Sequence, residues 1–150
     1  MSYGLTFDEI ELGSRFRHEP GRTIGEFDDT LFSLMTMNQH PVHIDEHYAR
    51  QTQHGQRLVV GLLVVSIVVG LTQADIAGQS LEVLEYEDIR HLGPVFHGDT
   101  LYAESVVAAK EIVDGARGVV TIESRGINQR GEAVLSLKQR FIAPRRSHHE

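Results

Sequence analysis

The chain has 150 residues, a length typical of a single domain, and it carries a formal net charge of −7 and no cysteine. The acidic balance argues against a nucleic-acid-binding protein, and the lack of cysteine excludes disulfides and thiolate chemistry. Residues 1–10 show no basic stretch followed by an apolar segment, so we expect a cytoplasmic protein without a leader or membrane contact.

The segment before Pro41 contains two short strand-like stretches and one helical pattern. Ser14–Phe16 and Arg22–Ile24 are expected to form strands around a turn at Pro20-Gly21. Glu26–Met37 is expected to be a helix that ends before Pro41, because the residue before a proline avoids the helical conformation. Its apolar residues recur at helical spacing: Phe27, Leu31, Leu34 and Met35.

The longest apolar run of the chain, Leu58–Leu71, follows a short predicted helix at Asp45–Gln53 that Asp45 caps. The run is shorter than the roughly 20 residues that a membrane-spanning helix needs. Its many valines favour a strand, whereas its length favours a helix, because buried strands usually run only about 4–8 residues. We therefore predict a helix at about 58–73 that is buried on all sides and that the other elements wrap.

The second half of the chain changes to the alternating pattern that is typical of strands. Consecutive strands are expected to pair as an antiparallel meander. They lie at Leu81–Ile89, Thr100–Lys110, Val119–Ile127 and Ala133–Ile142. A buried helix followed by antiparallel strands indicates the α+β class, with a curved sheet packed on the helix. Residues 143–150 are expected to be a flexible tail.

Polar residues gather just before the apolar run. Asn38 is followed after two residues by Pro41, then by His43 and by Asp45. This arrangement resembles the signature of the MaoC-like, (R)-specific enoyl-CoA hydratase family of hot-dog-fold proteins. In that signature an Asp stands where this chain has Asn38.

Two further blocks show the same resemblance. Arg57–Gly61 corresponds to the family's entry into its central helix, and Gly93–Leu101 corresponds to the start of a strand. Pro20–Thr23 and Thr36–Asn38 are similar to a subgroup that contains mesaconyl-CoA hydratases. The resemblance implies that residues 1–150 form one hot-dog domain that assembles as a homodimer or a higher assembly of dimers. It also implies an acyl-CoA thioester bound along the subunit interface, no metal, and no cofactor beyond the coenzyme A of the substrate.

The activity that the resemblance implies is reversible syn addition of water to a trans-2-enoyl-CoA. A short branched or dicarboxylic acyl group, such as that of mesaconyl-CoA, is the expected substrate. Carried over, His43 is the base, and the backbone N–H of Gly61 receives the thioester oxygen as it gains enolate character. The chemistry is coherent, because imidazole exchanges protons near neutral pH and a helix N-terminus offers unpaired N–H groups.

Asn38 is the departure from the family signature. An amide cannot transfer a proton as a carboxylic acid can, but it can hold a water with one donor and one acceptor. Either His43 makes both proton transfers while Asn38 positions the water, or this protein has lost or changed the activity. A third interpretation is structural, since Asn also suits the end of a helix for its turn chemistry.

Four further residues are candidates near the site, each with a structural alternative. His40 either supports His43 or is a turn residue. Ser66 either contacts the site or is buried and bonded to the backbone of its own helix. Arg57 and Arg90 either meet the phosphates of coenzyme A or a substrate carboxylate, or they are ordinary surface arginines.

Other functions stay open at this point. His43 and His47 fit the H-x-x-E-H pattern of a group of zinc peptidases, although no third ligand on a companion helix follows. A non-catalytic protein that binds acyl-CoA or an acyl carrier would account for Asn38. Thioester hydrolysis is the third alternative, because hot-dog domains also perform that reaction. The chain contains no nucleophile elbow, P-loop or G-x-G-x-x-G motif.

Overall fold

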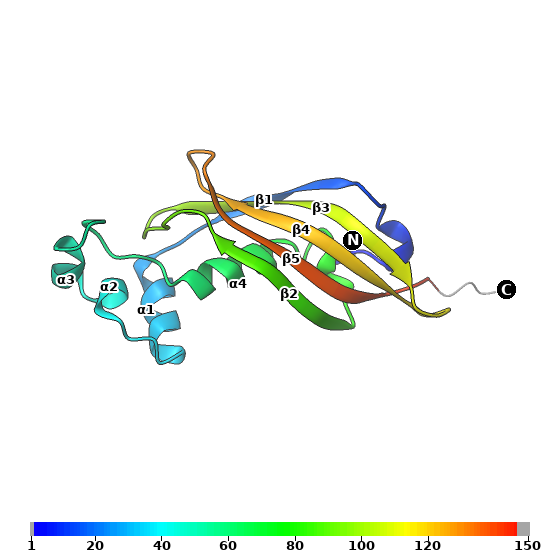
Figure 1. Ribbon diagram of the computed structural model, residues 1–150, viewed down its shortest axis with the longest axis horizontal. Helices are drawn as coiled ribbons and strands as arrows, with labels where there is room; N and C mark the ends of the chain where they lie inside the picture. Colours follow the sequence, from blue (N-terminus) through cyan, green and yellow to red (C-terminus); the bar gives the residue numbers. More distant parts are fainter. Residues whose placement is uncertain (1, 147–150) are drawn as a thin grey trace.

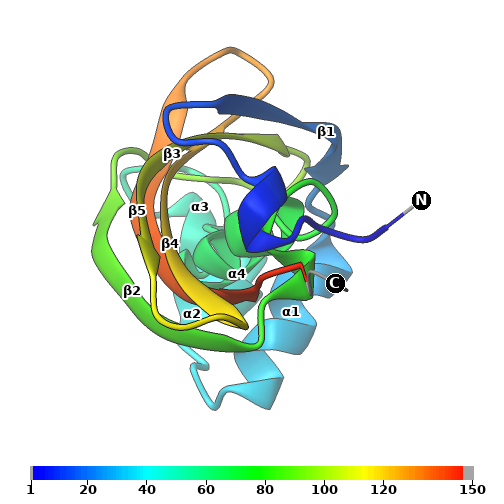
Figure 2. The same ribbon diagram turned by 90° about the vertical axis from the view of Figure 1, so that its right-hand side faces the viewer.

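A single curved sheet of five strands wraps one central helix, Gly61–Leu71 (Figure 1 and Figure 2). The computed structural model describes residues 2–146. In chain order the elements are η1 (Phe7–Glu9), β1 (Arg15–Thr23), α1 (Glu26–Met35), α2 (Pro41–Ile44), α3 (Glu46–Arg50), α4 (Gly61–Leu71), η2 (Ala77–Gln79), β2 (Glu82–His91), β3 (Thr100–Ile112), β4 (Arg117–Ile127) and β5 (Ala133–Pro144). The helices α1, α2 and α3 gather beyond one end of the sheet (Figure 1).

The strand order is β1-β3-β4-β5-β2, and every neighbouring pair is antiparallel. The predicted meander is confirmed for β3, β4 and β5. It is wrong for β2, which pairs with β5 instead of with β3, the next strand in the chain. The reason lies in residues 92–99, which do not form a hairpin. They pass beside the start of α4, where the N–H of Val59 donates to the carbonyl of Val95 at 2.8 Å.

The segment before α1 is one strand rather than the two that were expected. Pro20-Gly21 lies inside β1 and interrupts its register against β3 between His18 and Arg22. Proline is tolerated here because β1 is an edge strand. Glycine is required for close packing, since a Cβ on Gly21 would lie 2.6 Å from the ring of Tyr102. The predicted turn is therefore an irregularity within a continuous strand.

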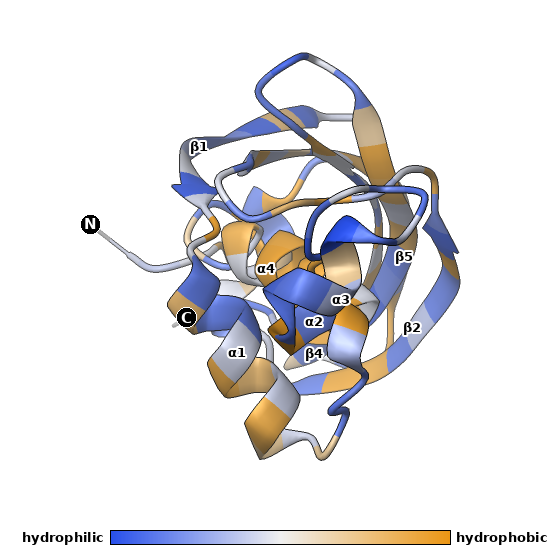
Figure 3. Cartoon of the chain, turned by 90° about the vertical axis from the view of Figure 1, so that its left-hand side faces the viewer, coloured by the Kyte–Doolittle hydropathy of each residue, from blue (hydrophilic) through white to orange (hydrophobic). Residues whose placement is uncertain are grey.

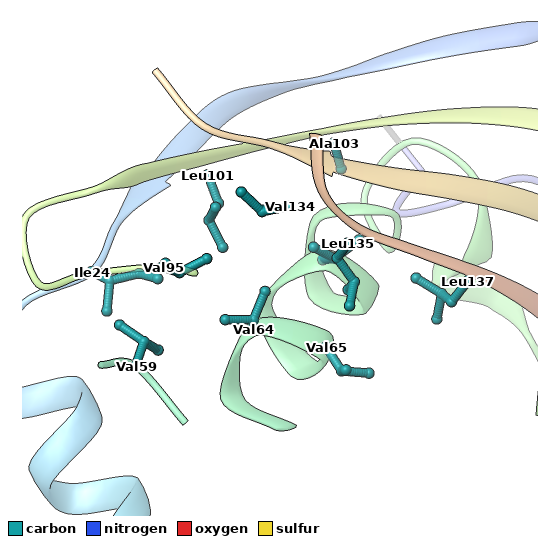
Figure 4. Packing of buried hydrophobic residues seen from close by; sticks show 11 residues of the cluster. Ile24, Val59, Val64, Val65, Val95, Leu101, Ala103, Val134, Leu135 and Leu137 are labelled. Atoms are coloured by element: carbon teal, nitrogen blue, oxygen red, sulfur yellow. The ribbon is translucent and has the colours of Figure 1, made fainter. Parts of the chain in front are cut away.

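Two apolar clusters fill the space inside the sheet, and a belt of polar side chains separates them. Along β3, Leu101 belongs to one cluster and Val107 to the other, while Ser105 lies between them. Ser124 on β4 and Gln139 on β5 continue the belt, and all three polar residues are buried. The cluster around the start of α4, shown in Figure 4, contains Ile24, Val59, Val64, Val65, Val68, Val95, Leu101, Ala103, Val134, Leu135 and Leu137.

The central helix is confirmed, but it begins at Gly61 instead of at residue 58. Leu58 forms a bridge with Phe96, and Val60 is extended at φ −56° and ψ 129°. β-Branched residues adopt extended backbone readily, so residues 58–60 run extended beside Phe96 before the helix starts. The helix is also not buried on all sides, because one of its faces is exposed. That face carries Leu62, Ser66 and Gly70.

Helix α1 is confirmed, and it carries several apolar residues although it lies at the outside of the molecule (Figure 3). The exposed fractions are 73% for Phe27, 41% for Leu31, 53% for Leu34 and 72% for Met35. Asp29 and Ser33 are fully buried instead. An amphipathic pattern predicts that the apolar face packs inward. In a single copy of this chain the reverse holds, because Asp29 has polar partners inside the molecule.

Regular structure continues further toward the end of the chain than expected. Strand β5 continues to Pro144, and Ala143 is fully buried. The N–H of Arg146 donates to a carboxylate oxygen of Asp8 at 2.6 Å. The predicted tail is therefore wrong for residues 143–146, and residues 147–150 lie outside the described part. None of the helices among residues 2–146 has the length and apolar character needed to cross a membrane.

Candidate active site

The polar segment before the apolar run folds into two short helices, α2 and α3, which Asp45 separates. Helix α2 starts with Pro41, and the Nδ1 of His40 accepts the N–H of Val42 at 3.1 Å. Asp45 ends α2 and starts α3, where its Oδ1 accepts the N–H of Tyr48 at 3.0 Å. The predicted cap at Asp45 is confirmed, although α3 ends three residues before the expected end. His40 thus has a capping role whatever else it does.

His43 lies on α2 and is held in one orientation by the backbone. Its Nδ1 is 2.8 Å from the carbonyl oxygen of Leu58. A carbonyl only accepts, so in the neutral imidazole Nδ1 carries the proton and Nε2 has the lone pair. The N–H of Leu58 donates in turn to the carbonyl of Val42 at 3.1 Å. The imidazole is therefore fixed on the extended segment that leads into α4, with one nitrogen available as a base.

Asn38 lies on the exposed connection between α1 and α2. Within residues 2–146 its side-chain amide makes no hydrogen bond, so it can hold a water. The left-handed residue at this helix end is Met37, at φ 63°, and not Asn38. The turn chemistry that favours Asn in a left-handed conformation therefore does not account for Asn38.

The start of α4 presents two free backbone donors. The carbonyl of Val60 accepts the N–H groups of Leu63 at 2.9 Å and Val64 at 3.2 Å. The N–H groups of Gly61 and Leu62 have no protein acceptor among the described residues. Unpaired N–H groups at a helix N-terminus carry partial positive charge and attract a developing anion. This end of α4 can thus receive a thioester oxygen.

Asp29 fixes the start of α4 and was not identified from the sequence. Its Oδ1 accepts the N–H of Val60 at 2.9 Å, and its Oδ2 accepts from Nε2 of His97 at 2.7 Å. The sequence showed Asp29 only as an acidic residue in a first helical turn. The one available signal was its spacing of four residues from Ser33, which marks a polar face that the tertiary structure buries.

Arg57 joins α1 to α3 through two carboxylates. Its Nη1 donates to Glu26 at 2.6 Å, and its Nε donates to Glu46 at 2.7 Å. The hydrogen bond to Glu26 is the largest cause that raises the pKa of Arg57, and the same bond lowers the pKa of Glu26. The guanidinium is therefore already neutralised by protein groups.

Ser66 and Arg90 are the remaining candidates. Ser66 donates to the carbonyl of Leu62 at 2.8 Å, as expected, but it is exposed instead of buried. Arg90 is exposed and has no ion-pair partner among the described residues. It lines an open groove of about 620 Å³ on the outer face of the sheet, together with Arg15 and Arg125. Neither His43 nor Gly61 lines this groove.

The zinc-peptidase pattern does not place its two histidines on one helix. His43 lies on α2 and His47 on α3, with the break at Asp45 between them. His47 is within 3.2 Å of the side chain of Gln51. Within residues 2–146, no group of three or more His, Cys, Asp or Glu side chains is close enough to hold a metal ion.

Three known proteins are similar to this chain in sequence or in structure. A mesaconyl-CoA hydratase from Cereibacter sphaeroides is 37% identical over 89% of this chain and 39% of its own length. An R-hydratase from Pseudomonas aeruginosa has 25% identity and a TM-score of 0.82, covering 95% of this chain and 88% of that one. A Mycobacterium tuberculosis protein with a double hot-dog fold has 19% identity and a TM-score of 0.87, covering 98% of this chain and 46% of that one.

These matches establish the hot-dog fold and a difference in length. The chain spans 39% of the length of the mesaconyl-CoA hydratase that it matches. The family described as "MaoC like domain" matches residues 9–128, which contain the whole segment from Asn38 to Gly61. With that match over most of its length, the chain belongs to the MaoC-like domain family.

Proposed function

We propose that this protein is an acyl-CoA hydratase/dehydratase that adds water reversibly across the double bond of a trans-2-enoyl-CoA. The observation that carries the proposal is the hydrogen bond from His43 to the carbonyl of Leu58. It leaves Nε2 of His43 as a base and ties the imidazole to the segment that ends at Gly61. The base and the oxyanion donors are thereby parts of one continuous structure.

The proposed reaction needs one base and one anion site. A water held by the Asn38 amide gives a proton to Nε2 of His43, and its oxygen bonds to the β-carbon. The electrons of the double bond move toward the carbonyl, and the N–H of Gly61 stabilises the enolate oxygen. His43 then returns the proton to the α-carbon, so that one water is added and the thioester is kept. The reverse sequence is dehydration.

The named relatives support this reaction class and suggest the acyl group. The mesaconyl-CoA hydratase supports a short branched or dicarboxylic substrate such as mesaconyl-CoA. Since that relative is more than twice as long as the segment it shares with this chain, the substrate is part of the proposal. No cofactor beyond the coenzyme A of the substrate is included, and the proposed location is the cytoplasm.

A second copy of the chain is the proposed partner. Strand β2 is an edge strand, so its outer side offers free backbone donors and acceptors. The exposed large apolar residues on β2 and just beside it are Leu81, Val83, Tyr86, Ile89 and Leu92. A homodimer or an assembly of dimers would cover them. Arg90 is the proposed contact for the phosphates of coenzyme A, whereas Arg57 is proposed to hold α1 against α3.

The decisive experiment follows the loss of absorbance of the conjugated thioester with crotonyl-, mesaconyl- and longer enoyl-CoA substrates. His43→Ala should reduce turnover by at least about 100-fold, as the loss of a general base does. His47→Ala is the matched control, because that histidine is exposed on the neighbouring helix, and it should keep wild-type turnover. Unchanged hydration in His43→Ala would contradict the proposal.

The presence of Asn38 where the family signature has Asp supports one alternative, a non-catalytic acyl-CoA or acyl-carrier binding protein. That alternative predicts binding by calorimetry without turnover in the wild type, and activity that appears in Asn38→Asp. The hydratase proposal predicts wild-type turnover that Asn38→Asp changes only a few-fold. A thiol-release assay separates both from thioester hydrolysis, because hydration leaves the thioester intact.

A further inference from the structure

His91, the last residue of β2, packs directly on Gly61. A Cβ built on Gly61 would lie 2.8 Å from Cε1 of His91, 3.2 Å from its Nε2 and 3.4 Å from its Nδ1. The ring therefore turns the edge that carries both nitrogens toward the first residue of α4. Glycine at position 61 is required for this contact, since any side chain there would displace the imidazole.

The imidazole of His91 has no polar partner in the described part of the chain. The other six histidines among residues 2–146 each have a hydrogen-bond partner: His18, His40, His43, His47, His54 and His97. His91 is also exposed, although it lies against the helix start. Both of its nitrogens are thus free to interact with a molecule bound at Gly61.

The place where an enolate oxygen would bind is within reach of this ring. The unpaired N–H of Gly61 defines one side of that place, and an ideal Cβ lies only about 2.5 Å from the nitrogen of its own residue. With Nε2 of His91 3.2 Å from that Cβ position, an acceptor at hydrogen-bond distance from Gly61 can also approach the ring. Asp29 accepts from Val60 and His97 with both of its oxygens, and as a carboxylate it cannot act as a donor there.

We propose that His91 is a second donor of the oxyanion site: its ring N–H and the backbone N–H of Gly61 together bind the thioester oxygen. This inference rests on the proposed function. Two preorganised donors directed at a developing charge stabilise the transition state more than the substrate, so the effect belongs to kcat.

The test replaces His91 by Phe, which fills similar space without a donor, and by Gln, which keeps an N–H. His91→Phe should lower kcat by about 100-fold with KM changed less than about threefold, as expected for one oxyanion donor. His91→Gln should recover at least about tenfold of that loss. His47→Phe is the matched control at an exposed histidine and should keep the wild-type kcat.

Different results separate the two proposals. If His91→Phe keeps its kcat while His43→Ala loses activity, the role of His91 is wrong and the hydratase stands. A wild type that turns over no enoyl-CoA overturns both. Equal losses of kcat in His91→Phe and His91→Gln, with a lowered melting temperature, would show that the ring only packs against α4.

The contact itself is tested by a double-mutant cycle that does not depend on turnover. Gly61→Ala should lower the melting temperature of the wild type, because its Cβ meets the ring at 2.8 Å. The same substitution in His91→Ala should not lower it, since the obstructing ring is gone. Additive effects in the cycle would mean that His91 does not lie on Gly61, which would overturn the inference.

Discussion

Two histidine–aspartate pairs lie at opposite ends of α4, and their surroundings give them different roles. At the start of the helix, His97 donates to Asp29, whose other oxygen accepts the backbone N–H of Val60. That pair acts on the backbone beside the free donors of the candidate site. Past the end of the helix, His18 lies 2.8 Å from Asp75.

The second pair belongs to a row of four side chains that are linked by hydrogen bonds. The Nε2 of His18 is 2.8 Å from the hydroxyl of Ser105, which is 2.7 Å from the hydroxyl of Ser124. The order Asp75–His18–Ser105 resembles a hydrolase triad, but the hydroxyl has no access to a substrate because Ser105 is 4% exposed. The same two residue types therefore support the candidate site in one pair and stabilise the interior in the other, according to what surrounds them.

The largest effect is expected when the pair of His18 and Asp75 is broken. His18→Ala leaves the buried hydroxyls of Ser105 and Ser124 short of a partner and opens a cavity. We expect it to lower the free energy of unfolding by about 3 kcal/mol, while the folded fraction keeps the wild-type kcat. Urea denaturation and the hydration assay measure the two quantities. The control is Arg17→Ala at the preceding, exposed position, which should change stability by less than about 0.5 kcal/mol. A loss of kcat in folded His18→Ala would contradict the separation of the two pairs.

An intermediate effect is expected when the pair of Asp29 and His97 is broken. Asp29→Ala removes the acceptor of Val60 and the partner of His97, so the start of α4 should shift. We expect a loss of about 2 kcal/mol in the free energy of unfolding and a fall in kcat of about tenfold or more. The matched control is Asp28→Ala, next to it but on the outside of α1. It should cost only about 1 kcal/mol, because Asp28 caps Gly25, and leave kcat unchanged. Equal kcat values for the two variants would contradict a link between Asp29 and the site.

The smallest effect is expected in the pH dependence of stability, which depends on the ionised carboxylate of Asp28. The N–H of Gly25 and then Arg22 lower the pKa of Asp28 below its ordinary value. The folded state therefore favours the carboxylate, and its stabilisation is present above the ordinary pKa of aspartate. It is lost as the pH falls through the lowered value. Asp28→Asn should consequently lose less stability on acidification than the wild type, by under about 1 kcal/mol. A larger acid loss in Asp28→Asn would contradict this sign.

Local patterns in the sequence were enough for several elements. The alternation along β3, β4 and β5 and the apolar run of α4 predicted these elements correctly, because period and length are properties of the chain itself. The pairing of β2 with β5 was not predictable in this way. It depends on the path of residues 92–99 beside α4, which no local period encodes.

The residues of the candidate site also fall into those that the sequence identified and those that it did not. His43, Asn38 and Gly61 were identified from spacing and resemblance, since they belong to two segments close in sequence. Asp29, His97 and His91 were not, because they come from α1, from the loop before β3 and from β2. Their roles arise only where these three elements meet the start of α4.

By itself the sequence determined the α+β class and the central helix, because these follow from period and composition. Its resemblance to a known family indicated the residues that could carry the chemistry. Only the tertiary structure decided which groups are free to act. It tied Arg57 to two glutamates, buried Asp29 under an outward-facing apolar stripe, and left His91 without a partner on Gly61. The physical reason is that a hydrogen bond or a burial requires two groups to meet in space, and those groups lie far apart along the chain.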